Sequence, residues 1–325
     1  MFNIDHHSFQ KMDNLSMQKQ PFFFIINFLM DRVEVFTEDQ LKSSGVLVEF
    51  KGMSNVDTQS YSTPKLEFEA LIEDVESYKK GFEIVQNHLK YGNSYLANYT
   101  RKTEVKTNFS LADFFHQSKA KYKVLYPEKF VFFSPETFVE IKGNRIFTHP
   151  MKGTIDASVE NAAEVLKNDV KEKAEHYTVV DLLRNDLSMV ADEVVVDEFQ
   201  RIDHLVTAQK NLLTMSSEIS GVLKPEFQNK IGSVLKKLLP AGSILGAPKT
   251  KTLEIVLEAE GHERGFYTGV CGWFDGENLD SCVMIRFIEQ ENEKFYFKSG
   301  GGITHLSKLE DEYQEVKNKI YVPIY

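Results

Sequence analysis

Residues 130–154 read FVFFSPETFVEIKGNRIFTHPMKGT, and this stretch decides the fold class. Runs of Phe, Val and Ile, which favour strands, alternate in it with Pro and Gly, which end strands and open turns. Such spacing predicts consecutive strands joined by short connections, in place of strands separated by crossover helices. The stretch therefore predicts a β meander that ends in a tight turn.

The rest of the chain alternates between strand and helix patterns. Strand patterns occupy 21–50, 95–107, 193–202 and 266–303, and a Ser/Thr/Asn-rich loop is expected at 51–65. Helix patterns occupy 66–92, 158–191 as two successive helices, the residues after Pro248, and the stretch after 309. Because strands and helices do not alternate regularly as βαβ units, the fold class is predicted to be α+β.

Composition and charge exclude several classes of protein. The 325 residues are 42% hydrophobic, enough for a sizeable core. A formal net charge of −10 argues against nucleic acid or an anionic membrane as partner. Two cysteines, Cys271 and Cys282, are too few for a disulfide framework, which favours a reducing cytoplasm.

The amino-terminal residues are not expected to direct export or membrane insertion. Residues 1–20 are polar without periodicity and are predicted to be a flexible leader. The apolar run at 21–30, PFFFIINFLM, is too short to span a bilayer and is interpreted as a buried strand.

Two pairs of glutamates occur at helical spacing. Glu172 and Glu175 lie in KEKAEH, and Glu312 and Glu315 lie in EDEYQEVKNK. Residues three apart share one helix face, with about 4.5 Å of axial rise between them, and Lys319 falls on the same face as Glu315. A solvated helix face explains either pair alone. Oxygen ligands from two helices, with positions left for water and substrate, suit Mg²⁺.

Two glycine-rich segments are candidates for binding an anion. In PAGSILGAPKTKTLEIV, residues 240–256, small residues surround Ser243 and a helix is expected after Pro248. Backbone amides at a helix start bind anions, so a carboxylate site is reasonable here, and a structural turn is the alternative. The run SGGGIT, residues 299–304, lets a ligand approach the backbone closely because glycine has no Cβ.

Arg286 and Tyr267 are further candidates for holding a ligand. Arg286 is predicted to lie in the middle of an apolar strand, VMIRFIE, where an unpaired guanidinium is costly to bury. It needs a carboxylate partner, either from a ligand or from an internal salt bridge. Tyr267, in ERGFYTG, is positioned to direct a hydroxyl toward the same place. Cys271 is interpreted as a buried structural residue, so the chain has no glutaminase of its own.

Seven segments in this order resemble the chorismate-utilising enzymes, a family that includes anthranilate synthase component I, aminodeoxychorismate synthase component I, isochorismate synthase and salicylate synthase. The segments are SPETFVEI, HPMKGT, EKAEHYTVVDLLRND, PAGSILGAPK, ERGFYTGVCGWFDG, VMIRFIE and GGGITHLSKLEDEYQEVKNK. The resemblance implies a large two-sheet α/β sandwich with helices outside the sheets and the site between them. It also implies one catalytic domain over 21–325, in which 21–91 is a shortened amino-terminal part and 92–320 carries the motifs.

The resemblance implies a role for each candidate residue. The direct Mg²⁺ ligands are expected to be Glu175 and Glu315, with Glu172 and Glu312 acting nearby or through water. The substrate carboxylate is expected to be held by Tyr267, Arg286 and the backbone of Gly301 and Gly302, near Ser243. Lys319 is expected to neutralise charge beside the metal.

Lys152, in PMKGT, decides the subtype. The chain is similar here to aminodeoxychorismate synthases, which carry lysine where other members have a small residue. An amine can attack C2 of chorismate before ammonia attacks C4, and Glu136 matches the general acid for the departing hydroxyl. The resemblance thus implies chorismate and ammonia as substrates, with ammonia supplied by a glutamine amidotransferase subunit.

Two alternatives remain open. Anthranilate synthase component I requires Lys152 to be a bystander. A non-catalytic chorismate or Mg²⁺ binding paralogue is suggested by two departures from the family pattern. These are Leu96, where water-using members place lysine and aminating members glutamine, and Thr214, where histidine is frequent.

Overall fold

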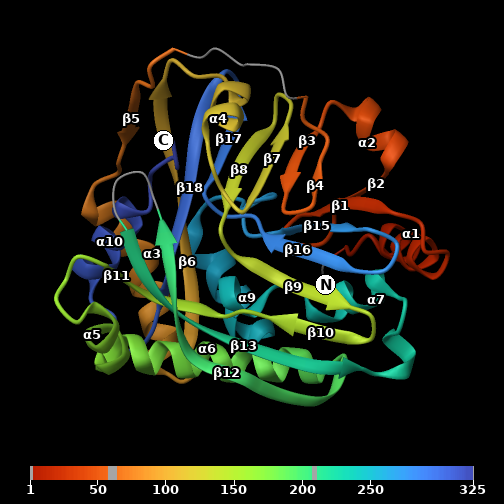
Figure 1. The fold of residues 1–325 in the computed structure, drawn as a ribbon. Helices are drawn as coiled ribbons and strands as arrows, with labels where there is room; N and C mark the ends of the chain where they lie inside the picture. Colours follow the sequence, from red (N-terminus) through yellow and green to blue (C-terminus); the bar gives the residue numbers. More distant parts are fainter. Residues whose placement is uncertain (1–2, 58–63, 207–210, 325) are drawn as a thin grey trace.

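Two antiparallel sheets form the centre of the molecule (Figure 1). The computed structural model describes residues 3–57, 64–206 and 211–324. The first sheet has the strand order β11 (Met151–Asp156), β13 (Asn211–Leu223), β10 (Arg145–Thr148), β9 (Thr137–Lys142), β16 (Leu279–Val283), β15 (Val270–Phe274), β1 (Phe22–Ile26) and β2 (Val33–Thr37), with β12 (Ala191–Val206) paired to β13.

The second sheet is also antiparallel and contains the remaining strands. Its order is β14 (Gly246–Ala247), β6 (Leu96–Thr107), β18 (Lys294–Ile303), β17 (Phe287–Glu291), β8 (Phe130–Ser134), β7 (Tyr122–Tyr126), β3 (Leu47–Phe50) and β4 (Met53–Ser54), with β5 (Phe68–Leu71) paired to β6. The predicted meander divides between the two sheets, because β8 lies in the second sheet and β9, β10 and β11 in the first.

The side chains of β1 explain why its sequence is apolar at every position. Phe22, Phe24 and Ile26 belong to one buried cluster, whereas Phe23 and Ile25 belong to another. The second cluster also contains residues of β3, β7, β8 and β17, so it lies between the two sheets. Since successive side chains of a strand point to opposite faces, a strand buried on both faces must be apolar throughout. The predicted two-sheet sandwich is confirmed.

Helices cover the outer faces of both sheets. The cluster outside the first sheet includes residues of α1 (His6–Met17), α6 (Val170–Ser188) and α7 (Ile231–Leu238). The clusters outside the second sheet include residues of α3 (Val75–Lys90), α9 (Lys249–Glu260), α10 (Leu309–Asn318) and α4 (Leu111–Gln117). The remaining helices are α2 (Glu38–Ser44), α5 (Ala162–Asn168), α8 (Gly242–Leu245) and the short η1 (Pro225–Phe227). None of the described helices is both long enough and apolar enough to cross a bilayer.

The prediction of a flexible leader over residues 1–20 is wrong. Residues 6–17 form α1, whose side chains Phe9 and Met12 are buried against α7 and the first sheet. A Cβ at Gly232 would lie 1.9 Å from the carbonyl oxygen of Phe9, so the two helices touch backbone to backbone. The periodic signal was weak because only Phe9, Met12 and Leu15 repeat at helical spacing among polar residues.

The helix predicted over residues 66–92 is partly wrong. Its first part is β5, in which exposed and half-buried side chains alternate as on the edge of a sheet. The helix begins only at Val75, where the carboxylate of Asp74 accepts a hydrogen bond from the Ser77 amide and caps the first turn. The loop predicted at 51–65 contains β4, and residues 58–63 of it lie outside the described residues.

Candidate active site

Glu136 and Ser243 are brought into direct contact. Glu136 lies in the short connection between β8 and β9, where its amide donates to the Ser134 hydroxyl and its carbonyl accepts from the Val283 amide. Ser243 lies in the four-residue helix α8 and donates from Oγ to Glu136 Oε1 over 2.8 Å. The predicted general acid is therefore oriented by the predicted substrate-binding serine.

Tyr267 lies at the margin of the cluster between the sheets and is 4% exposed. Burial raises the pKa of its phenol well above the ordinary value, and the positive charges of Arg264 and Arg286 partly oppose that rise. The negative charge of Glu136 also acts on this phenol. Arg286 and Glu136 therefore lie close enough to Tyr267 for their charges to act on its phenol.

Arg286 does not lie in the middle of a strand, so that prediction is wrong. It occupies the junction between β16 and β17 with a φ of +51°, and its guanidinium lies 4.4 Å from the centre of the Tyr321 ring. Within residues 3–57, 64–206 and 211–324, no carboxylate forms an ion pair with Arg286. The internal salt bridge that was considered for Arg286 is therefore not observed in this part of the chain.

The second acidic pair lies over the glycine-rich strand. A Cβ at Gly301 would lie 3.4 Å from Glu315 Oε1 and 3.5 Å from Glu312 Oε2, so both carboxylates converge on this glycine. Glu312 is buried at 1% exposure, and Glu315 is paired with Lys319 at 2.7 Å. Lys319 also donates to the carbonyl oxygen of Gly300 over 2.8 Å. Glu312 and Glu315 of α10 and Gly301 of β18 therefore form one site, called here the acidic cradle.

Gly302 belongs to the same stretch of β18. It pairs with Asn98 of β6, one residue after the pairing of Gly301 with Tyr99. The glycine backbone is therefore held in the second sheet beside the start of β6. The neighbouring Leu96 is 4% exposed and belongs to the hydrophobic core, whereas Tyr95 before it is 68% exposed.

The first acidic pair lies on α6 beside β11. Gly153 has a φ of +78°, and a Cβ there would lie 3.0 Å from Glu172 Oε2, so a side chain at this position would be strained and would crowd Glu172. The backbone of Lys152 precedes this glycine and pairs with Met215, and the Lys152 side chain lies outside the described part of the structure. Thr214 donates to the carbonyl oxygen of Gly153 over 2.9 Å and fixes this segment from the next strand.

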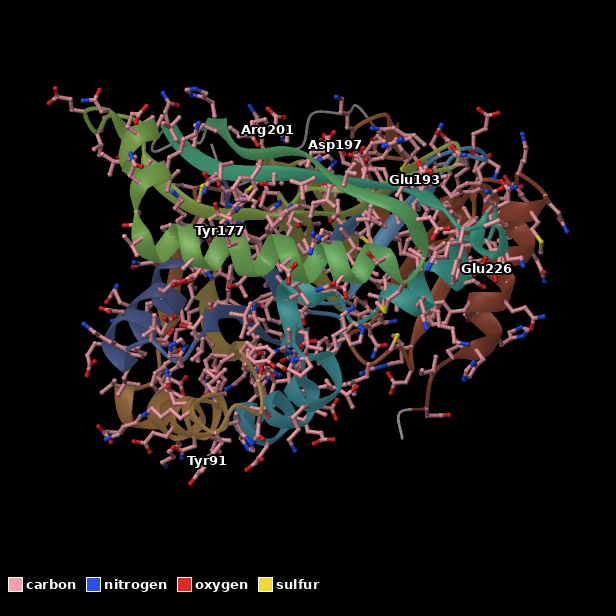
Figure 2. All side chains as sticks on the ribbon, turned by 90° about the horizontal axis from the view of Figure 1, so that it is seen from below. Tyr91, Tyr177, Glu193, Asp197, Arg201 and Glu226 are labelled. Carbon is pink, nitrogen blue, oxygen red and sulfur yellow. The ribbon has the colours of Figure 1, made fainter. Side chains whose placement is uncertain are left out.

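Glu175 lies three residues after Glu172 on the same helix. The next residue, His176, is fully buried and its Nε2 lies 2.7 Å from the Ser217 hydroxyl, whereas Tyr177 is 52% exposed. Figure 2 shows Tyr177 on α6, which runs alongside β12. The α6 pair and the α10 pair lie against different sheets; in Figure 1, α10 lies at the left and α6 runs along the bottom.

The donor chemistry of the two acidic pairs fits a hard cation such as Mg²⁺, because all the donors are carboxylate oxygens. Over the described ranges, no group of three or more His, Cys, Asp or Glu side chains is arranged to hold a metal ion. Each pair offers at most two protein ligands in this arrangement. Mg²⁺ commonly binds through one or two carboxylates and retains waters or substrate oxygens for its other positions.

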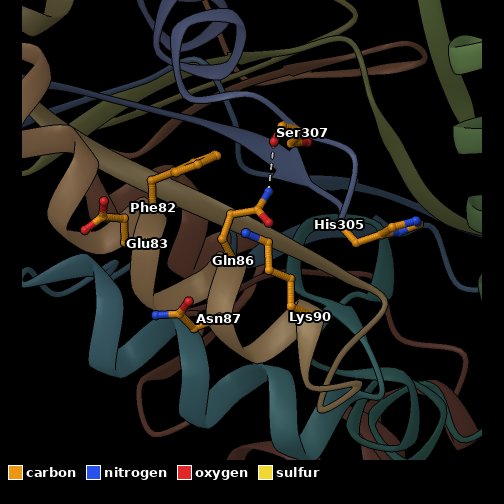
Figure 3. Close-up of a pocket in the computed structure, with 7 residues that line it drawn as sticks. All are labelled: Phe82, Glu83, Gln86, Asn87, Lys90, His305 and Ser307. Atoms are coloured by element: carbon orange, nitrogen blue, oxygen red, sulfur yellow. Dashed lines mark hydrogen bonds between the residues drawn. The ribbon is translucent and has the colours of Figure 1, made fainter.

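A hollow of about 360 Å³ lies away from these residues, on α3 and the loop between β18 and α10 (Figure 3). It is lined by Phe82, Glu83, Gln86, Asn87, Lys90, His305 and Ser307. None of the predicted site residues contributes to it. Gln86 donates to the carbonyl oxygens of Thr304 and Ser307, which ties α3 to this loop.

One buried and one partly buried ion pair were missed from the sequence. Glu260 and Arg264 pair at 2.6 Å with both side chains 1% exposed, and Lys249 pairs with Asp186 at 2.9 Å. Burial raises the pKa of Asp186 and lowers that of Lys249. The sequence did show that Glu260 and Arg264 are four residues apart. That spacing is not diagnostic, because it is also common among exposed ion pairs on helices.

Known proteins resemble this chain over nearly its whole length. The sequence pattern of the chorismate binding enzyme family matches residues 33–324. An uncharacterized PabA-like protein of Pasteurella multocida is 47% identical over 320 residues, which cover 98% of this chain and 99% of the relative.

Two solved structures share the fold. Anthranilate synthase component I from Streptococcus pneumoniae superposes with a TM-score of 0.66 at 26% identity, over 78% of this chain and 58% of that chain. This chain thus spans less than two thirds of that enzyme. The menaquinone-specific isochorismate synthase from Escherichia coli superposes with a TM-score of 0.74 at 16% identity, over 98% and 81% of the two chains.

Proposed function

Because the chain belongs to the family of chorismate binding enzymes, we propose that it is the aminating component I of an aminodeoxychorismate synthase. It would convert chorismate and ammonia to 4-amino-4-deoxychorismate, a precursor of p-aminobenzoate and folate. The observation that carries the proposal is the lysine at position 152, which precedes Gly153, the residue that approaches Glu172 in the first turn of α6.

The substrate carboxylate would be held on the second sheet. Arg286 offers a guanidinium and Tyr267 a phenol that burial keeps protonated at neutral pH. The substrate carboxylate could also approach the backbone of Gly301 and Gly302 closely, because glycine has no side chain. Ser243 would orient Glu136 for proton transfer to the leaving hydroxyl.

Mg²⁺ would be held by Glu175 and Glu315, with Glu172 and Glu312 acting directly beside them or through water. When bound, the ion neutralises the negative charge of the substrate carboxylate. Lys319, which is paired with Glu315, would reduce the electrostatic repulsion between the carboxylates.

The amination would proceed in two substitutions. The Lys152 amine attacks C2 of chorismate, and the C4 hydroxyl leaves as water after taking a proton from Glu136. Ammonia then attacks C4, and the bond between C2 and the lysine nitrogen breaks. A separate glutamine amidotransferase subunit would supply the ammonia, since the cysteines of this chain are buried within the sheets and suit no nucleophile role.

A product assay tests the proposal. The purified chain is incubated with chorismate, Mg²⁺ and ammonium, and the lyase that forms 4-aminobenzoate is then added. Appearance of 4-aminobenzoate only when the lyase, Mg²⁺ and ammonium are all present is expected. Anthranilate or isochorismate as the product would overturn the proposal.

Two other functions are each favoured by an observation. The likeness to anthranilate synthase component I from Streptococcus pneumoniae favours that activity, with Lys152 as a bystander. The burial of Leu96 in the core and the hydrogen bond from Thr214 to backbone favour a non-catalytic chorismate or Mg²⁺ binding protein. Thermal stabilisation by chorismate without turnover would identify the second.

A further inference from the structure

We infer that Arg264, paired with Glu260, is a positioning residue that aligns the substrate-holding segments without touching substrate. This inference rests on one part of the proposed function, the binding of chorismate at the described site. It does not depend on which reaction follows. Arg264 lies in the segment ERGFYTG and Glu260 lies outside the seven segments, and the sequence analysis assigned neither residue a role.

The Arg264–Glu260 pair is among the most deeply buried charges in the described chain. Glu260 is the last residue of α9, and Arg264 lies in the turn that follows. Arg264 Nη2 and Nε lie 2.6 and 2.9 Å from the two carboxylate oxygens of Glu260. Desolvating two charges is expensive, so such a pair adds little to stability compared with apolar side chains of the same volume. We therefore expect the role of the pair to come from the other hydrogen bonds that the guanidinium donates.

All five N–H groups of the guanidinium have acceptors. Besides Glu260, Nη1 donates to the carbonyl oxygen of Ile244 over 3.0 Å and to the Thr268 hydroxyl over 3.2 Å, and Nη2 donates to the carbonyl oxygen of Asn98 over 2.6 Å. These acceptors belong to α8, to the turn before β15 and to β6. One planar group therefore fixes three segments that are far apart in the chain.

Each acceptor lies beside a residue of the proposed substrate grip: Ile244 follows Ser243, Thr268 follows Tyr267, and Asn98 pairs with Gly302. Glu260 adds a fourth link by accepting a hydrogen bond from the Thr100 amide. A displacement of the guanidinium would consequently move all of these segments relative to one another.

The backbone at Thr268 shows that this alignment is enforced. Thr268 is β-branched yet has a φ of +61°, a conformation that such residues avoid. Strain of this kind persists where surrounding contacts over-determine the conformation. Here Arg264 donates to the Thr268 hydroxyl, and the Thr268 amide donates to the Met284 carbonyl oxygen over 2.8 Å. Met284 lies two residues before Arg286, so the constraint extends from Tyr267 to Arg286.

The test compares Arg264→Lys with the wild-type chain. Lysine keeps the positive charge but lacks the planar fork that reaches three acceptors at once. Faster amide hydrogen exchange is expected in 96–100, 242–246 and 265–269. The Kd for chorismate in the presence of Mg²⁺, measured by calorimetry, is expected to rise at least about tenfold, as for other displaced binding groups.

Tyr122→Phe is the matched control, because it removes a partly buried 2.7 Å hydrogen bond from Tyr122 to Asp280 elsewhere in the sandwich. It should lower Tm while the chorismate Kd stays within about twofold of wild type. If Arg264→Lys does not fold, the double variant Glu260→Gln with Arg264→Gln removes both charges and serves in its place.

A chorismate Kd within twofold of wild type in the Arg264 variant would overturn the inference. So would an increase in exchange no larger in the three segments than in β1 and β15. If the wild-type chain binds chorismate but makes no aminodeoxychorismate, only the proposed function fails. If it does not bind chorismate, the exchange pattern alone decides the positioning role.

Discussion

The Ser243 hydroxyl donates a 2.8 Å hydrogen bond to Oε1 of Glu136, which joins a four-residue helix to the connection between the two sheets. A hydrogen bond to a neutral carboxyl contributes about 0.5–1.5 kcal/mol. Ser243→Ala is therefore expected to lower kcat by about two- to tenfold through misorientation of the acid. Steady-state kinetics with ammonium measure this, and Ser243→Thr, which keeps a hydroxyl, is the control. An unchanged kcat in Ser243→Ala would contradict the role of Glu136.

Lys152→Ala should abolish turnover while chorismate still binds in the presence of Mg²⁺. The physical reason is that the amine acts only as the nucleophile, whereas the substrate carboxylate is held by other residues. Intact-protein mass spectrometry with chorismate and without ammonium should show an adduct on the wild-type chain and none on the variant. An adduct that persists in Lys152→Ala would exclude this lysine as the nucleophile.

Glu315→Ala should raise the Mg²⁺ concentration required for half-maximal activity at least about tenfold, because it removes an oxygen ligand from the cradle over Gly301. Asp311→Ala is the control, since Asp311 is an exposed acid on the same helix and lies outside the cradle. Magnesium titrations of both variants measure the effect. Equal magnesium requirements in the two variants would show that Glu315 is not a ligand.

Neighbouring glycines should respond differently to alanine. A Cβ at Gly300 would lie 2.8–2.9 Å from Thr100, Asn98 and the Tyr99 carbonyl oxygen, so Gly300→Ala should destabilise the fold by about 1–3 kcal/mol.

A Cβ at Gly301 would make ordinary contacts with Glu312 and Glu315, so Gly301→Ala should fold normally but weaken chorismate binding. Urea denaturation and calorimetry separate the two effects. Equal loss of stability in both variants would contradict the described packing of β18.

Acidification should destabilise the chain through His262. Burial lowers the pKa of this imidazole below its ordinary value of 6.5. The unfolded chain therefore binds the proton more readily, and the stability contributed by neutral His262 is fully present above pH 6.5 and is lost as the pH falls through the lower folded pKa.

His262→Gln can still donate a hydrogen bond to the Thr100 carbonyl oxygen but does not titrate. Its Tm should fall less than that of the wild-type chain between pH 7 and pH 5. His149, whose pKa burial also lowers, retains its own contribution in this variant. Identical pH profiles for the two chains would show that His262 does not contribute.

The strands of the meander and the helix pair around 158–191 could be predicted because their signals are local. Alternating Phe, Val and Ile with Pro and Gly breaks need no knowledge of distant residues. The helix α1 and the strand β5 were missed because each is stabilised by a partner elsewhere in the chain, α7 and β6 respectively. Local propensity is a weak guide where such tertiary contacts dominate.

The amino-acid sequence by itself determined the chemistry available to this protein: the two pairs of glutamates, the lysine at 152, the glycine-rich strand, and strands apolar enough to be buried on both faces. Only the tertiary structure decided which of these groups meet. Glu136 and Ser243 are 107 residues apart in the chain. Arg264 donates hydrogen bonds to three segments, and nothing in their sequences indicates that they meet. Such meetings depend on strand register and on how the sheets pack, which arise from the whole set of long-range contacts and leave no local pattern.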